Sequence, residues 1–383
     1  MQIDLYGGFG EKGRTSVGLG DAHTRILLDV GIKVGAMGRD YYPVIEDAAI
    51  KDLDAVFISH AHEDHIGGLS WLLSRGFRGL IFMTRETLGE AAEMLAQYAD
   101  PSHVRDFPIH PDQIKLFSPG ETMHVGQFKI MTGRSGHVVG GAWFHIDNGH
   151  GQVVYCADVT PGSSVFVMDP VPRCDLVLLD TSYADDAISG LQRRMQIENW
   201  LAAHPSGCLL PVPASGKPLE IMAILPGRFA IHQTMREAIA TQILAEDAFA
   251  PATRDLLRQR LAAADDWSDG SPFPDCPLLT VDGMGSAGPS VDAIRRAAAQ
   301  GLPILLTGHI PDHTPARRCF DEERAAWIRL PTHPTRDENV AIWTGAGRPA
   351  ALGHSCSQSG LRDLQAFLPK LDVNAVTGDH LAI

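Results

Sequence analysis

The chain has 383 residues, of which 44% are hydrophobic and 20% are charged, a composition that excludes fibrous, collagen-like and largely disordered proteins. Its formal net charge of −14 at pH 7 argues against a general polyanion binder, because the summed field repels phosphate at long range. Any nucleic acid would therefore have to be held by a local basic patch or by metal.

Short apolar runs bounded by Gly, Asp and Pro dominate the first half of the chain and predict strands. They lie at residues 25–31, 54–60, 79–85, 127–133, 142–147, 152–158 and 174–180, with a helical pattern at 84–99. Several runs end in Asp or His. Side chains just past the end of a strand project into the loops where sites are built.

From about residue 188 the pattern changes to alternating helices and strands, which is typical of a parallel sheet. Helices are predicted over 188–204, up to about 264 and over 291–301, and strands over 207–213, 277–283 and 302–308. Residues 339–355 return to strand composition. An amphipathic helix at 361–371 and a last strand at 373–380 complete the prediction.

Six scattered cysteines include no CxxC pair, which argues against a zinc ribbon or a thioredoxin-like site. The first residues show no basic-then-apolar signal, and no apolar run reaches the ~20 residues that a membrane span requires. We therefore expect a soluble, cytoplasmic protein without a membrane partner, whose cysteines pack as small core residues.

Four candidate metal ligands follow the run at 54–60 within six residues. The segment ISHAHEDHIGG supplies His60, His62, Asp64 and His65. A strand end followed by a tight turn and a helix start can direct these side chains into one small volume, where the first two chelate one ion and the last two turn to a second. Imidazole and carboxylate without thiolate suit zinc or manganese.

Further candidate ligands lie at the ends of other predicted strands. His137 lies in a Gly-rich turn where the backbone can approach a ligand closely. Asp158 ends a strand and is suited to bridging two metals, whereas Asp29 could orient a histidine ligand from behind. Each of the three alone could be an ordinary loop or cap residue, and the histidine cluster favours the metal interpretation.

These motifs resemble those of the metallo-β-lactamase superfamily. ISHAHEDHIGG is similar to its defining motif, and LVLLDTSYAD with Asp180 and AALGHSCSQSGLRDL with His354 resemble two motifs of its β-CASP branch. LLPVPASGKPLEIMAIL, LLTVDGMGSAGPS and ILLTGHIPDHTPARR resemble segments of the cap domain of that branch. The order is similar to that in ribonuclease J and in the endonuclease subunit of the cleavage and polyadenylation factor.

The resemblance implies an α/β fold, an αββα sandwich formed by residues 1–187 and 346–383, with a β-CASP cap inserted over 188–345. It also implies two zinc ions, with manganese as the alternative, and substrate in the cleft between the domains. One ion would bind His60, His62, His137 and Asp158, and the other would bind Asp64, His65 and Asp158.

The catalytic roles implied by the resemblance follow the two-metal scheme. The ions share a hydroxide that attacks the phosphodiester in line, and Asp64 is required to place it. His354 protonates the leaving oxygen, and Asp180 orients that histidine.

The predicted cap contains a candidate phosphate site. Ser215, Gly216 and Lys217 lie between a strand and a helix start, where free backbone N–H groups and a lysine favour an anion. Lys217 is the only lysine between residues 191 and 345. Arg317 and Arg318 could line the same cleft. An ordinary solvated turn remains the alternative for Lys217, as does a solvent-facing helix start for the arginines.

The sequence departs from the family at the last motif, a histidine in a Val-His-Gly-Glu setting that completes the second metal. Here the matching stretch is AVTGDH, with Thr377 at the histidine position and Asp379 at the glutamate position. We expect His380 to bind the second metal through a shifted loop. The alternative is a second metal that lacks this ligand.

The leading functional hypothesis is a metal-dependent phosphodiesterase that acts on RNA or single-stranded DNA. A metallo-hydrolase of a small-molecule ester, phosphoester or lactone competes with it, because the chain is acidic and shows no aromatic-basic stacking surface. A non-catalytic subunit of a processing complex is the third hypothesis, and a homodimer is a further option.

Overall fold

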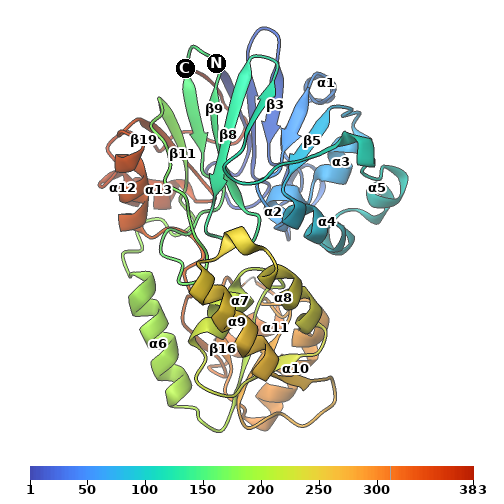
Figure 1. The fold of residues 1–383 in the computed structure, drawn as a ribbon, viewed down its shortest axis with the longest axis vertical. Coiled ribbons are helices and arrows are strands. Elements are labelled where there is room, and N and C mark those ends of the chain that lie inside the picture. Colours follow the sequence, from blue (N-terminus) through green and yellow to red (C-terminus); the bar gives the residue numbers. More distant parts are fainter. Residues whose placement is uncertain (311) are drawn as a thin grey trace. The chain divides into compact units, whose positions relative to one another are not determined.

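The computed structural model describes residues 1–310 and 312–383. The chain divides into two compact units, each of which is described by itself (Figure 1). The first comprises residues 1–161, 168–187 and 333–383, and the second comprises residues 162–167 and 188–332.

The first unit contains two sheets of seven strands each. One sheet has the order β20(His380–Ala382), β1(Gln2–Gly7), β2(Ser16–Gly20), β3(Arg25–Leu28), β4(Ala55–Phe57), β5(Leu80–Met83) and β6(Ile114–Leu116). The other has the order β19(Leu371–Asp372), β18(Ala350–His354), β11(Leu176–Asp180), β10(Gln152–Tyr155), β9(Ala142–Asp147), β8(Phe128–Arg134) and β7(Thr122–Val125).

Side-chain alternation along the central strands places apolar residues on both faces of each sheet. In β3, Ile26 and Leu28 belong to the core between the sheets, whereas Leu27 faces the helices outside. In β10, Val153 joins the inner core and Val154 the outer one. Strands buried on both faces read as continuous apolar runs, which explains why the sequence patterns at 25–31 and 152–158 were clear.

Helices cover the outer faces of both sheets, so that the unit is an αββα sandwich, as expected (Figure 1). The helices of its first part are α1(Asp47–Lys51), α2(Glu63–Ile66), α3(Leu69–Ser74), α4(Arg85–Tyr98) and α5(Pro101–Asp106). The helices α12(Arg336–Gly345) and α13(Gln358–Gln365) pack on the other sheet through Ile342, Trp343, Leu361 and Leu364.

Two expectations for the last part of the chain are wrong. Residues 339–345 form the end of α12 rather than a strand, because Thr335 and Glu338 make a reciprocal capping box that starts a helix before this β-branched and aromatic stretch. Residues 373–379 form no strand either. The chain pairs briefly as β19 and again as β20, where His380 lies opposite Asp4 of β1.

The second unit is built on a parallel sheet of four strands, in the order β12(Cys208–Pro211), β15(Pro277–Thr280), β13(Ala230–His232) and β14(Asp265–Trp267). A parallel pair, β16(Leu305–Leu306) and β17(Ala326–Trp327), extends it through a bridge from Leu209 to Ile304. Its helices are α6(Gly190–Ala202), α7(Lys217–Ile224), α8(Met235–Ile243), α9(Pro251–Ala263), α10(Gly288–Gln300) and α11(Pro315–Asp321).

The second unit ends at Thr332 and not at residue 345, where the sequence placed the end of the cap. Residues 333–345 lie in the first unit because α12 packs its Ile342 and Trp343 against that unit's sheet. The long segment of the second unit begins at Ile188. Among the described residues, no helix combines the length and apolarity that a bilayer crossing demands.

Candidate metal centre

The histidine-rich loop leaves β4 and enters α2 within a few residues. His62 is the N-cap residue of α2, and its carbonyl accepts hydrogen bonds from the backbone of His65 at 3.0 Å and of Ile66 at 2.9 Å. This tight turn leaves no room for a side chain at Gly31, where a Cβ would collide with the carbonyl of Asp64. The short connection therefore brings the histidines and Asp64 together.

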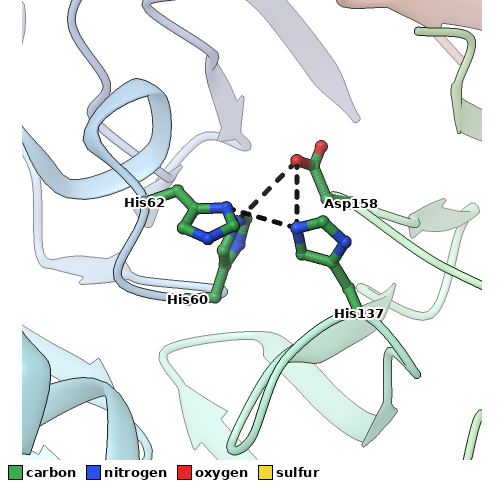
Figure 2. Close-up of side chains that lie close together, drawn as sticks. All are labelled: His60, His62, His137 and Asp158. Carbon is green, nitrogen blue, oxygen red and sulfur yellow. Dashed lines mark hydrogen bonds and ion pairs between the residues drawn. The ribbon is translucent and has the colours of Figure 1, made fainter. Parts of the chain in front are cut away.

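His60, His62, His137 and Asp158 converge from three loops on one small volume (Figure 2). One ligand atom of each lies within 4.8 Å of those of the others. Nε2 of His60 and Nε2 of His137 are 3.8 Å and 3.7 Å from Oδ2 of Asp158. Nδ1 of His62 is 3.0 Å from Nε2 of His60. Four nitrogen and oxygen donors in this arrangement could hold one metal ion.

Two imidazoles of this group, those of His60 and His62, are held in the form that binds metal. Burial, together with the neighbouring His65 and His62, holds the pKa of His60 well below its usual range. Burial and the facing His137 lower the pKa of His62 in the same way. A neutral ring keeps a lone pair for a metal ion.

Asp29 fixes the orientation of His65. It lies just past β3 in a left-handed backbone conformation, with φ of 58°, and is fully buried. Its Oδ2 accepts hydrogen bonds at 2.7 Å from Nδ1 of His65, Oγ of Ser59 and the hydroxyl of Tyr155. With Nδ1–H directed at Asp29, the ring turns Nε2 toward Asp158, as a carboxylate behind a histidine ligand does.

Two buried atoms at this point have no hydrogen-bond partner among the described residues, Nε2 of His65 and Oδ1 of Asp158. They lie 3.3 Å apart. Two ligands at ~2.0–2.1 Å from one tetrahedral ion are separated by about this distance. A buried polar group without a partner destabilises the fold, so this pair supports the presence of a metal ion. The residues at this point therefore fit the metal ion that a fold of this type implies.

Asp64 lies at the edge of the cluster. Its side chain is 30% exposed, and its Oδ2 is 3.9 Å from Nε2 of His65. Burial and the Asp158 carboxylate raise its pKa, although the His65 ring opposes this.

His333 belongs to the cluster and was missed in the sequence. Its Nδ1 lies 2.8 Å from Oδ2 of Asp180 and 3.7 Å from Oδ2 of Asp158, and these three residues form a second candidate donor group. His333 follows no strand and was assigned to the cap. The one available signal was a histidine between two prolines, just before the capping box of α12.

Asp180 and His354 lie side by side at the ends of β11 and β18, but Asp180 does not bond to the histidine that it was expected to orient. Its side chain accepts from His333, Ser182 and the backbone of Val159. His354 is fully buried, its Nδ1 lies 3.1 Å from Oγ of Ser355, and its Nε2 has no partner among the described residues. Burial lowers its pKa.

The structure does not place His380 in the cluster. Its side chain is 68% exposed, and its Nδ1 lies 2.6 Å from Oδ1 of Asp4, because pairing with β1 fixes it in β20, the edge strand of the sheet that contains β4. The hydroxyl of Thr377 contacts Oε1 of Glu11 at 2.8 Å and the carbonyl of Phe9 at 3.3 Å. The expectation of a shifted loop that carries His380 to the metal is therefore wrong.

The predicted phosphate-binding residues lie within the second unit. Gly216 is the N-cap of α7 with φ of 72°, and its N–H donates to Gln242 at 3.1 Å. Ser215 beside it is buried. Nζ of Lys217 donates to the carbonyl of Thr307 at 3.2 Å, and the side chain is 8% exposed. Arg317 pairs with Asp321 at 2.9 Å. Neither cation points freely into solvent.

Replacing Lys217 with methionine should change the pH dependence of stability. Burial, assisted by Arg329, lowers the pKa of Lys217 from 10.5 to about 8. Between these values the unfolded chain keeps a proton that the folded chain releases, so the free energy of unfolding rises with pH. Relative to Lys217→Met, the parent should gain about 3 kcal/mol between pH 7 and pH 11. Urea unfolding of both proteins across this range checks it, and parallel curves would contradict it.

The αββα layers, with a histidine–aspartate cluster in their loops, are features of the β-lactamase-type fold with a candidate metal centre. Residues 24–210 match the model of the β-lactamase superfamily domain. Residues 24–210 therefore form a β-lactamase superfamily domain, and the motifs of the chain resemble those of the β-CASP branch.

Two curated proteins and one solved structure illustrate the similarity. The chain is 27% identical to transcription termination factor FttA of Cenarchaeum symbiosum, over 99% of this chain and 63% of that protein. It is 32% identical to ribonuclease TTHA0252 of Thermus thermophilus, over 42% of this chain and 39% of that protein. It thus spans less than two thirds of either. A protein of unknown function from Enterococcus faecalis V583 shares the fold over 100% of this chain and 99% of its own, with a TM-score of 0.64 at 12% identity.

Proposed function

We propose that the chain is a metal-dependent phosphodiesterase that cleaves RNA, with single-stranded DNA as the alternative polymer. The observation that carries this proposal is the clustering of two donor groups around one shared carboxylate, that of Asp158. Two cations side by side suit in-line displacement at phosphorus. The names of the two similar curated proteins, a termination factor and a ribonuclease, supply the substrate class.

The proposed cations are zinc, with manganese as the alternative, because the donors are imidazole and carboxylate without thiolate. His60, His62, His137 and Asp158 would hold the first ion. Bound there, divalent cations lower the pKa of water and offset the negative charge that develops on the phosphate.

The chain's own residues orient these donors and move the proton. Asp29 fixes the tautomer of His65 through its 2.7 Å hydrogen bond. Nε2 of His354 is the proposed position of the proton that passes to the leaving oxygen, since this buried atom has no partner among the described residues. Burial of His60, His65 and His137 limits the access of bulk water to these histidines.

A second candidate is hydrolysis of a small-molecule ester, phosphoester or lactone by the same centre. Two observations favour it. The chain carries a net charge of −14, and the ammonium of Lys217 is engaged by a backbone carbonyl rather than presented to a phosphate.

The six cysteines are all unpaired, which fits our proposal of a reducing compartment such as the cytoplasm.

Incubation of the zinc-loaded protein with end-labelled single-stranded RNA should give fragments that disappear with chelator and return when zinc or manganese is restored. A His137→Ala protein purified in parallel serves as the control for contaminating nuclease, because it removes one donor of the first group. Labelled single-stranded DNA tests the alternative polymer.

The outcome against the proposal is equally specific. If the metal-loaded protein leaves both polymers intact but hydrolyses a chromogenic phosphodiester or a lactone in a chelator-sensitive way, the small-molecule hydrolase is correct. If it cleaves neither polymer nor any small substrate while holding its metal, the enzymatic proposal fails.

A further inference from the structure

The chain lacks an imidazole at the position of the last family motif, and the structure shows what occupies that position. The hydroxyl of Thr377 is engaged by Glu11 at 2.8 Å and by the carbonyl of Phe9 at 3.3 Å. Arg14 and Lys33 bind the same glutamate at 2.8 Å and 2.7 Å. Thr377 therefore contacts a glutamate that is already ion-paired, and its neutral hydroxyl is a weak metal ligand.

His333 brings an imidazole to the centre from a different part of the chain. Its ring lies between those of His137 and Tyr183, each with a centroid 5.1 Å away. The capping box of α12 starts two residues later at Thr335 and fixes the backbone there. The side chain is 21% exposed, so the ring is held in place by packing.

The position of His333 relative to Asp158 matches that of the other ligand candidates. Its Nδ1 is 3.7 Å from Oδ2 of Asp158. The corresponding distances to the same oxygen are 3.8 Å from His60 and 3.7 Å from His137. Three imidazole nitrogens thus surround one carboxylate oxygen at equal range, and the third of them is also 2.8 Å from Asp180.

The charges at this point require a cation. Asp158 and Asp180 are 3% and 0% exposed, and their ligand atoms lie within 4.8 Å of each other. Across residues 1–310 and 312–383, neither carboxylate forms an ion pair with a lysine or arginine, and the ion pairs that they form are with histidines. Two buried carboxylates without a strong cation are costly. A divalent ion offsets their two charges at one point.

We propose that Asp158, Asp180 and His333 hold a second metal ion, with Asp158 shared between the two positions, so that His333 supplies the imidazole that Thr377 lacks. The inference deepens the proposed function and rests on it for the first ion. It assigns Asp180 as a ligand, rather than as the residue that orients His354. His65, 3.3 Å from the other oxygen of Asp158, and Asp64, 3.9 Å from His65, are available to complete the coordination.

Metal binding tests the proposal without any substrate. Parent, His333→Ala and Asp180→Asn proteins are equilibrated with buffered free zinc and analysed for metal per chain, and cobalt-substituted samples are compared by visible spectroscopy. The parent should bind two ions. Both variants should keep the first and bind the second at least ~10²-fold more weakly, with loss of one cobalt component.

Two further variants keep the test decisive. If His333→Ala folds poorly, His333→Gln takes its place in the test, because glutamine keeps the bulk and polarity of the side chain. This variant should also lose the second ion. His380→Ala is the matched control. It removes another contact between a histidine and an aspartate, the 2.6 Å contact of His380 with Asp4, which lies outside the cluster, and both ions should stay bound.

The proposal is overturned if the parent binds one ion at saturation, or if the His333 and Asp180 variants bind two with parental affinity. Two retained ions with lost turnover would instead make His333 and Asp180 a proton-transfer pair. The metal result can be separated from the proposed function. If the parent binds one ion and still cleaves RNA, only this inference is wrong. If the variants lose the second ion but the parent does not cleave RNA, only the nuclease proposal is wrong.

Discussion

Replacing Asp158 with asparagine should abolish metal binding at both positions and reduce turnover of any true substrate by at least ~10³-fold, since metal ions contribute several kcal/mol to such transition states. Asp158 is the one residue common to both donor groups. Asparagine keeps the size of the side chain but removes the charge that lies within 3.8 Å of His60, His65, His137 and His333.

The measurement is metal content per chain alongside the rate of hydrolysis. The zinc-induced rise in melting temperature should vanish as well, because a ligand stabilises only a folded state that binds it. Asp112→Asn is the matched control, since that side chain is 91% exposed. An Asp158→Asn protein that retained two ions and parental turnover would remove this carboxylate from the centre.

Replacing His354 with glutamine should lower kcat by ~10²–10⁴-fold, the usual contribution of a general acid, while both metal ions stay bound. The ring is fully buried at the end of β18, and its Nε2 has no partner among the described residues. An unpartnered buried nitrogen costs stability, which favours a function for it. A proton donor acts mainly in the transition state, so KM should change little.

The decisive comparison is between the His354 and His333 variants. We expect the His354 variant to lose turnover while it keeps both ions, and the His333 variant to lose the second ion. This result would assign proton transfer to His354 and metal binding to His333. Ser355→Ala, which removes the 3.1 Å contact to Nδ1 of His354, controls for an indirect effect of the neighbouring turn. Unchanged turnover in His354→Gln would exclude it from the mechanism.

The sequence predicted the sandwich well because its central strands are buried on both faces. The run at 142–147 coincides with β9, and the runs at 152–158 and 174–180 contain β10 and β11. Where alternate residues pack against two different cores, apolar character is continuous and strand signals are strong. At residues 339–345 the same composition lay in a helix, because the capping box outweighed it.

The candidate site was predictable where its residues follow strands. His60, His62, His137 and Asp158 lie in loops close behind β4, β8 and β10, and the structure brings them within 4.8 Å. His333 could not be found in this way. It follows an irregular segment, and its position depends on the packing of α12 and on ring contacts with His137 and Tyr183, which lie far away in the sequence. His380 was wrongly predicted to be a metal ligand because the spacing within a motif does not show that this residue joins β20 and pairs with β1.

The order in which the chain leaves the ribosome has a consequence for assembly of the centre. All four donors of the first group precede residue 160, whereas His333 follows the whole main segment of the second unit, as do β18, β19 and β20. At ~5–20 residues per second, His333 appears about 9–35 s after Asp158. The nascent chain can thus capture one ion early, while the sheet edges and the last imidazole are added only after the main segment of the second unit has been made.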